Sequence, residues 1–366
     1  MRYALDVTFC NIAFTKNNCM KRKLLSIIAL AGMMWHQGVA QKGFTLRVSG
    51  GYAWPGFLKT DPITGPKIDP YSPQIDGLIP MANIDEKNKS YELIKGSYGQ
   101  GGNVTLGFGY MINNYFGVEM GLSFLKSATM KATQIRPLTI QTGFGQPPQF
   151  SSVGYFMTAK IETKAFGLSL MPSVVVTGNK PGCKVYPYGR LGISLPVFGE
   201  LEHDIDIQLE DSASVLLGLV NASPYFLGQN TKVKLKTEGT VSIGVNGAIG
   251  IAYKPLPYMM VTAEVNGQYL VTRAKKAKIV QWDTDGTDRI ADRGVYRTEF
   301  EFVDKLDASS NNAEYNSAYD PTKPKQDIRP TGPFSNLGFN VGVTFLLSKE
   351  TLAKKDGGTS KKAKKN

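Results

Sequence analysis

The chain has 366 residues and a formal net charge of +12, with three cysteines and two histidines. The first 40 residues carry a net charge of +4 and the last 18 carry +5, so the body between them carries only about +3. This balance excludes a general nucleic-acid binder, and the single cysteine of the body, Cys183, excludes a disulfide within it.

The first 40 residues have the composition of an export signal. A basic cluster at 21–23 precedes an apolar run over 24–34, and small residues lead up to Ala40. The run is shorter than the roughly 20 apolar residues that a membrane-spanning helix needs. We predict that residues 1–40 form an N-terminal extension and a signal peptide cleaved after Ala40. Residues 1–19 fit no signal sequence, so a true start at Met20 is a further hypothesis.

From residue 44 onward, apolar residues alternate with small or polar ones in eight segments. In the first segment, Phe44, Leu46 and Val48 alternate with Thr45 and Arg47. A period of two is typical of a β-strand with two different faces, and each run has about the length of a membrane-spanning strand. The segments are 44–54, 102–111, 115–126, 163–177, 185–197, 240–253, 258–270 and 336–346.

Short and long connections alternate between these segments. The short ones lie at 113–114, 178–182 and 254–257, and the long ones at 55–101, 127–162, 198–239 and 271–335. Outer-membrane barrels place short turns in the periplasm and long loops outside, whereas a soluble β-sandwich has no reason for such alternation. We therefore predict an all-β fold over residues 41–348: an eight-stranded antiparallel transmembrane β-barrel with four long extracellular loops.

Aromatic and proline residues add detail to this prediction. Aromatic rings near the segment ends predict two girdles at the membrane interfaces. Pro172 and Pro196 predict bulges or strand ends, because proline lacks the N–H that a β-ladder uses. The girdle residues are Phe44, Tyr110, Phe116, Tyr253 and Phe345 at the periplasmic rim, and Trp54, Phe124, Phe166, Phe198 and Tyr269 at the outer rim.

The export signal, the eight segments, the stretch YPYGRLG at 186–192 and the closing stretch LGFNVGVTF at 337–345 are similar to those of a known family. Together they resemble the small outer-membrane β-barrel proteins of the OmpA/OmpW-like superfamily. The resemblance implies a place in the cell outer membrane, contact with its lipid, and insertion by the barrel-assembly machinery through the last strand. In one departure from the family, about twenty residues follow Phe345.

The inward-facing positions carry the main candidate site, a lumen polar network of Arg47, Glu119, Arg190, Glu264 and Gln268. Buried charges need partners, and an eight-stranded barrel is only wide enough for side chains or one small ligand. We therefore predict a plug of mutually paired side chains, in which Arg47 pairs with Glu119 or Glu264. A narrow polar conduit is the alternative. The lumen also holds Asn103, Asn246, Asn266 and Asn340.

Two further candidates lie in the long connections. His203 is the only histidine beyond residue 40; it is interpreted as a solvated loop residue, and the alternative is the base of a lipid-modifying enzyme. Asp283, Asp285 and Asp288 have a spacing similar to that of a calcium loop, but the stretch lacks the glutamate that such a loop needs. A hairpin turn at Asp285-Gly286, joining 277–281 to 295–302, is the favoured interpretation.

The Lys-rich stretch 349–366 is predicted to be a disordered periplasmic tail, with contact to anionic lipid or cell-wall polymer as a hypothesis. For the whole chain, we expect a structural or binding role through the extracellular loops, with no enzyme activity, no cofactor and no nucleic-acid partner. The alternatives are a small porin or transporter for small or hydrophobic solutes, a lipid-modifying enzyme, and an accessory subunit of an envelope protein complex.

Overall fold

The computed structural model describes residues 43–56, 61–68, 75–113, 115–141, 150–178, 183–210, 230–256 and 258–347. The predicted export signal at 1–40, its cleavage after Ala40, the start at Met20 and the tail at 349–366 lie outside these residues. Within the described ranges, no helix is long and apolar enough to cross a membrane.

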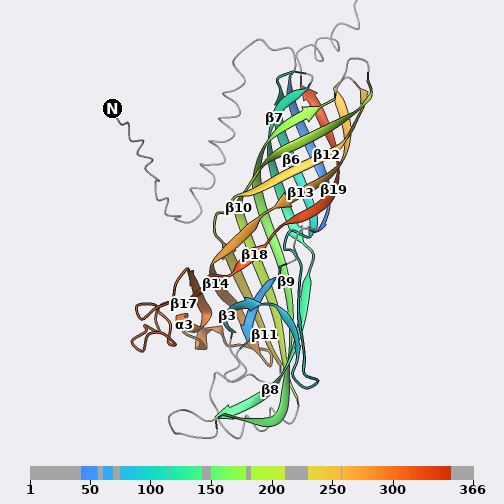
Figure 1. The fold of residues 1–366 in the computed structure, drawn as a ribbon. Helices are drawn as coiled ribbons and strands as arrows, with labels where there is room; N and C mark the ends of the chain where they lie inside the picture. Colours follow the sequence, from blue (N-terminus) through green and yellow to red (C-terminus); the bar gives the residue numbers. More distant parts are fainter. Residues whose placement is uncertain are drawn as a thin grey trace, which may run out of the picture. The chain divides into compact units, whose positions relative to one another are not determined.

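Eight strands close into an antiparallel barrel, as predicted (Figure 1). Each strand pairs with the next one around the wall, and the last strand pairs with the first: Phe44 lies opposite Leu347, and Pro55 lies opposite Asn336. In order around the wall, the strands are β1 (Phe44–Pro55), β6 (Gly101–Met111), β7 (Phe116–Ser127), β9 (Phe150–Thr177), β10 (Val185–Leu209), β12 (Gly244–Leu256), β13 (Met259–Tyr269) and β19 (Asn336–Leu347).

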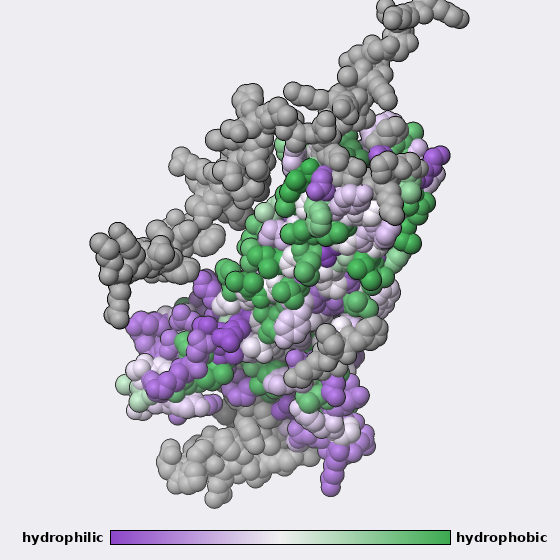
Figure 2. All heavy atoms as spheres, turned by 45° about the horizontal axis from the view of Figure 1, so that its top comes forward, coloured by the Kyte–Doolittle hydropathy of each residue, from purple (hydrophilic) through white to green (hydrophobic). Residues whose placement is uncertain are grey.

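The barrel wall has an apolar outer face and a polar inner face. On β1, the side chains of Val48 and Tyr52 are 43% and 41% exposed, whereas Arg47 and Ser49 are each 3% exposed. Figure 2 shows apolar side chains covering the visible part of the wall. The period-two sequence pattern therefore separates a lipid-facing surface from a filled lumen.

Strands β9 and β10 continue beyond the barrel, and further strands of the same sheet pair around them to form a region that we call the lobe. Strands β9 and β10 have 28 and 25 residues, so the alternating segments predicted at 163–177 and 185–197 cover little more than their barrel parts. Much of the predicted long loops is therefore β-structure. The lobe also contains β4 (Ala82–Asp85), β5 (Ser90–Leu93), β8 (Met130–Gln141), β11 (Asn230–Gly239), β14 (Val271–Thr284), β16 (Glu299–Val303) and β17 (Lys325–Ile328).

Smaller elements complete the long connections. Strands β2 and β3 form a separate two-stranded sheet, while β15 and β18 each pair with β14. The bounds are β2 (Thr64–Ile68), β3 (Ile75–Pro80), β15 (Thr287–Asp288), η2 (Ile290–Asp292), α3 (Val295–Thr298) and β18 (Thr331–Pro333).

The inner face of the barrel wall continues as the apolar core of the lobe. On β9, Ala165 and Ile161 are at most 1% exposed and belong to this core, together with Trp282 of β14 and Phe302 of β16. The lipid-facing side of β9 becomes charged in the lobe: toward the lobe, the residue next to Phe166 on this face is Lys164. The outer face of β9 thus changes from apolar to charged side chains where the strand leaves the barrel.

The two prolines in the strands have different effects. The pairing of β10 with β9 shifts register between Pro196 and Phe198, which confirms the irregularity predicted at Pro196. Pro172 of β9 lies opposite Met120 of β7 in an unbroken ladder, and the register with β10 is the same on either side of it. The prediction of a bulge or strand end at Pro172 was therefore wrong. The strand keeps its register on both sides although proline has no N–H to donate to the ladder.

The wall opens between β10 and the chain that leads into β12. Strand β12 begins at Gly244 and not at Thr240 as predicted, because the Thr240 N–H bonds to the Arg273 carbonyl of β14 at 2.7 Å. Pairing of β10 with β12 ends at Ser194, and pairing of β10 with β11 begins at Glu200. Along this described stretch, residues 195–199 have no strand partner on the side away from β9, and Val197, at the register shift, has none on β9 either. We call this opening the wall gap.

Candidate functional site

Four charged side chains meet inside the barrel in one layer. Arg47, Glu119, Arg190 and Glu264 come from β1, β7, β10 and β13, which are every second strand around the wall. In a narrow barrel, alternate strands direct side chains to the same level, so four side chains fill the cross-section. Because arginine and glutamate alternate around the ring, the layer, which we call the charge layer, has a formal net charge of zero.

Arg47 donates four hydrogen bonds in and beside the charge layer. Its Nε and Nη2 donate to the two carboxylate oxygens of Glu119 at 3.1 and 2.7 Å, which is a two-pronged contact. Its Nη1 donates to Ser49 Oγ at 3.2 Å and to Glu264 Oε1 at 3.4 Å. Arg47 therefore contacts both of the carboxylates that the sequence analysis named as alternatives.

Arg190 and Glu264 close the other side of the ring. Arg190 Nη2 donates to Glu264 Oε1 at 2.6 Å, and its Nη1 donates to Glu119 Oε1 at 3.3 Å. The hydroxyl of Tyr188 donates to Glu264 Oε2 at 2.6 Å, and Asn340 Nδ2 donates to Glu264 Oε1 at 3.5 Å. The side chains of the four charged residues are 1–9% exposed, so they share their charges with one another rather than with solvent.

A glycine on the strand between two charged strands makes room for the layer. Gly107 of β6 lies opposite Arg47 of β1. A Cβ atom at Gly107 would lie 2.9 Å from the carboxyl carbon of Glu119, closer than real Cβ contacts come. The glycine on the inner face thus lets the guanidinium and carboxylate groups approach across an intervening strand.

The charge layer lies between two cavities of the barrel. The inner cavity, toward the short turns, is lined by Tyr186, Met260 and Thr344 and has a volume of about 80 Å³. The outer cavity, toward the lobe, has a volume of about 160 Å³. Arg190 lines both cavities, which places the layer at their boundary.

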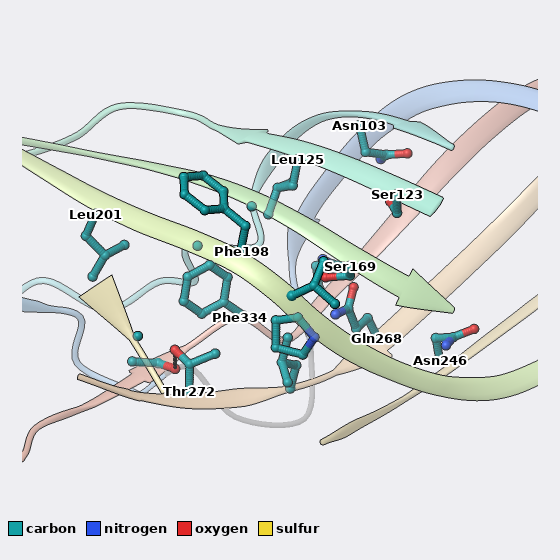
Figure 3. Close-up of a pocket in the computed structure, with 18 of the residues that line it drawn as sticks. Asn103, Ser123, Leu125, Ser169, Phe198, Leu201, Asn246, Gln268, Thr272 and Phe334 are labelled. Carbon is teal, nitrogen blue, oxygen red and sulfur yellow. Dashed lines mark hydrogen bonds between the residues drawn. The ribbon is translucent and has the colours of Figure 1, made fainter. Parts of the chain in front are cut away.

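The outer cavity has a polar part and an apolar part. Figure 3 shows Asn103, Ser123, Asn246 and Gln268 toward one end and apolar side chains toward the other. The labelled apolar residues are Leu125, Phe198, Leu201 and Phe334. Gln268 bonds to Ser194 Oγ at 2.9 Å and lines this cavity, so it lies on the lobe side of the charge layer and not within it.

His203 is buried and is not the solvated loop residue that the sequence analysis expected. It lies on the lobe part of β10, is 0% exposed, and its Nδ1 is 2.8 Å from the Thr163 hydroxyl. Burial lowers the pKa of His203 to about 4, because the charged imidazolium would lose its hydration. A neutral imidazole enclosed in the lobe core has no surface on which to meet a lipid substrate.

The three aspartates with the spacing of a calcium loop lie in and beside a hairpin turn. Asp285 and Gly286 have positive φ angles of 48° and 80° and form the two-residue turn between β14 and β15. Asp285 Oδ1 accepts the Asn230 N–H at 2.8 Å, and Asp283 lies opposite Asp288 in the ladder. In the described part of the chain, no cluster of three or more histidine, cysteine or acidic side chains could hold a metal ion.

The predicted pairing of 277–281 with 295–302 is only partly correct. Residues 276–278 of β14 do pair with 299–301 of β16, but 295–298 form the short helix α3. The predicted turn at Asp285-Gly286 leads first into β15 and not directly into the second segment.

Comparison with known proteins gives one family match. A family model described as "Outer membrane protein beta-barrel domain" matches residues 24–345. No curated protein matches the chain.

Solved structures of small barrels are similar to this one at low identity. Neisserial surface protein A has 8% identity and a TM-score of 0.28, with 85% of this chain and 100% of that one covered. OprG from Pseudomonas aeruginosa has 12% identity and a TM-score of 0.32, with 84% and 99% covered. Outer membrane protein W of E. coli has 12% identity and a TM-score of 0.29, with 85% and 100% covered.

The charge layer predicts strong coupling between Arg47 and Glu119. Replacing either alone, as Arg47→Met or Glu119→Gln, leaves a buried charge without its partner and should lower the free energy of unfolding by about 3–5 kcal/mol. The double variant should cost clearly less than the sum of the two. Urea unfolding in lipid vesicles measures all four proteins of the cycle. The exposed pair of Lys278 and Glu299 is the control, with an expected coupling of about 1 kcal/mol or less; equal couplings for the two pairs would contradict the buried layer.

The burial of His203 predicts a loss of lobe stability in mild acid. Its pKa is lower in the folded lobe than in the unfolded chain, so its contribution is fully present above about pH 6.5. As the pH falls from about 6.5 to 4, the unfolded chain takes up the proton first, and stability falls by up to about 3 kcal/mol. Hydrogen exchange of β9 and β10 amides at pH 7 and pH 5 measures this. A His203→Gln variant should lose the steeper part of the pH dependence; an unchanged profile would refute the assignment.

Proposed function

The chain belongs to the family of outer-membrane proteins with a β-barrel domain, and on this premise we propose that it is a non-conducting barrel of the cell outer membrane that presents the lobe as its binding surface. The observation that carries the proposal is the charge layer, which supports a plugged lumen. The lobe supports the binding role, because its strands hold the long connections in an ordered surface outside the barrel.

The energetics of the charge layer favour a closed lumen. A solute passing through the barrel would have to separate at least one arginine from its carboxylates. Separating a buried pair leaves a charge without compensation, at a cost of several kcal/mol. Tyr188 of β10 and Asn340 of β19 also bond to Glu264, so the layer is fixed in position. A steady aqueous path through such a layer is therefore unfavourable.

The lobe is suited to recognition because its outer face is rigid and rich in charge. Lysines of β11 bridge acidic residues of β10: Lys236 Nζ lies 2.7 Å from Glu200, and Lys234 Nζ lies 3.3 Å from both Glu202 and Asp204. Such exposed pairs contribute little stability each, but they order a patterned surface over a packed core. Binding sites in proteins commonly lie on segments that a rigid scaffold positions in this way.

The alternatives receive different support from the geometry. A small porin would need a continuous polar path, against which the charge layer counts. A lipid-modifying enzyme would need an accessible base, and the buried His203 does not supply one. An accessory subunit of an envelope complex fits the proposal, since the lobe would then be the surface that meets the other subunits.

Conductance tests the plugged lumen. In planar bilayers, the folded protein should show no steady open channels. The double variant Arg190→Ala with Glu264→Ala removes half of the charge layer without leaving a net charge, and it should show small, measurable conductance. Lys278→Ala with Glu299→Ala, an ion pair of the lobe, is the matched control and should stay silent. Steady channels from the unaltered protein would refute the proposal.

A pull-down in gentle detergent tests the lobe as the binding surface. Phe302→Ala truncates a core side chain that is 1% exposed and should weaken the lobe by about 3–5 kcal/mol, while the barrel stays heat-modifiable on gels. Envelope components captured by the unaltered protein should be depleted with this variant. Val341→Ala, on the lipid-facing side of β19, should capture them normally. Equal capture by both variants would place the binding surface elsewhere.

A further inference from the structure

The wall gap joins the outer cavity to the lipid-facing side of the barrel. Val197 and Phe198 border the gap on β10, and Val241 borders it on the chain before β12; all three line the outer cavity and are 53%, 55% and 84% exposed. The register shift between Pro196 and Phe198 lies at this border. The mouth of the cavity is thus apolar and lies in the wall, at the level of the outer aromatic girdle that the sequence predicts at Phe166 and Phe198.

The cavity is covered at its other ends. Toward the inner half of the barrel it ends at Arg190 of the charge layer. Toward the lobe it is lined by Leu78, Leu201 and Leu270, of which Leu78 and Leu270 are buried. The wall gap is therefore the route by which a ligand would reach the cavity, and such a ligand would come from the outer leaflet of the membrane.

Three polar groups in this cavity have no hydrogen-bond partner among the described residues. In the described part of the chain, Asn246 Nδ2, Asn340 Oδ1 and the hydroxyl of Thr237 are buried without a hydrogen-bond partner, and all three residues line the cavity. Thr237 is 2% exposed and Asn340 is 4% exposed. Buried polar groups are normally bonded, and leaving one unsatisfied costs free energy. A ligand that offers both donors and acceptors would recover this free energy.

The size of the cavity limits the polar part of the ligand. Its volume of about 160 Å³ is close to that of a cavity known to hold one six-membered ring, roughly 150 Å³. Asn103, Asn266 and Gln268 also line it, so amide groups dominate its polar side. Three charged residues line the cavity. Arg190 is shared between Glu119 and Glu264 through both Nη atoms, with only its Nε unbonded in the described structure; Glu200 is paired with Lys236, and Arg273 is exposed. These features fit an uncharged head group of about one ring.

We propose that the outer cavity binds a single-chain amphiphile from the outer leaflet, with its uncharged, hydroxyl-rich head group among the amide side chains and its alkyl chain passing out through the wall gap. The amides supply hydrogen bonds without requiring a charge on the ligand. The apolar border formed by Val197, Phe198 and Val241 suits the chain. The unpaired backbone groups of residues 195–199 are costly beside hydrocarbon, and an occupant of the gap would cover them.

The test uses decyl glucoside as the probe, with one sugar ring and one chain. The folded protein, released from a short polyoxyethylene detergent, is titrated with the probe and followed by native mass spectrometry. We expect saturable binding of one probe molecule. Asn246→Leu and the nearly isosteric Thr237→Val should each weaken binding roughly tenfold, because each removes a hydrogen bond to the head group. Gln281→Leu removes an exposed amide of the lobe and should bind normally.

The controls separate this site from detergent on the outside of the barrel. Decyl sulfate and decyltrimethylammonium carry the same chain with a charged head group and should bind at least tenfold more weakly than the glucoside. Equal binding of all three, or equal affinity in all variants, would show chain binding alone and overturn the proposal. Gel heat-modifiability confirms that each variant is folded. If Asn246→Leu does not fold, the Thr237→Val result decides. Silent conductance together with absent probe binding would reject the amphiphile site while leaving the plugged lumen intact.

Discussion

In the hydrocarbon of a membrane, every backbone N–H and C=O group needs a partner within the protein, and closure of β1 on β19 meets this constraint for the wall except at the wall gap. Once the wall is closed, side chains on alternate positions can only face lipid or the lumen. The lumen of eight strands is too narrow for a hydrated charge, so the arginines and glutamates that point into it must neutralise one another. The charge layer is thus a consequence of closure and alternation.

The same alternation links the barrel to the lobe. Along β9 and β10 the inner face changes from a polar lumen to an apolar core, and the outer face changes from apolar to charged, without a break in the strands. The same two strands therefore run first through a wall with lipid outside and a polar lumen inside, and then through a lobe with water outside and an apolar core inside. The register shift near Pro196 lies where this change occurs, which is also where the wall gap opens.

Much of the barrel could be predicted from the sequence, because lipid and lumen impose a strict period of two on each strand. The inward direction of Arg47 and its candidate partners followed from that period. The ring of four, and the roles of Tyr188 and Asn340, depend on the stagger between strands, which the period does not determine. The wall gap depends on one backbone bond from Thr240 to Arg273, and the sequence carries no signal for it.

His203 is a different case, because a signal was present. Leu201, Ile205 and Ile207 alternate with acidic residues through this part of β10, and His203 is in phase with the apolar positions. Extending the period-two test beyond Val197 would have predicted a buried histidine. The one-residue irregularity near Pro196 inverts the phase of the strand, and this inversion hid the continuation.

The long ladder of β9 and β10, in spite of its register shift, also has a mechanical consequence. These strands pair from Tyr188 and Thr177 near the short turn to Leu209 and Met157 in the lobe. A force that pulls the lobe away from the membrane acts along the strands, perpendicular to their hydrogen bonds. The load is then shared in shear by many bonds at once, and they do not break one after another. The lobe is consequently held to the barrel by many hydrogen bonds that resist such a force together.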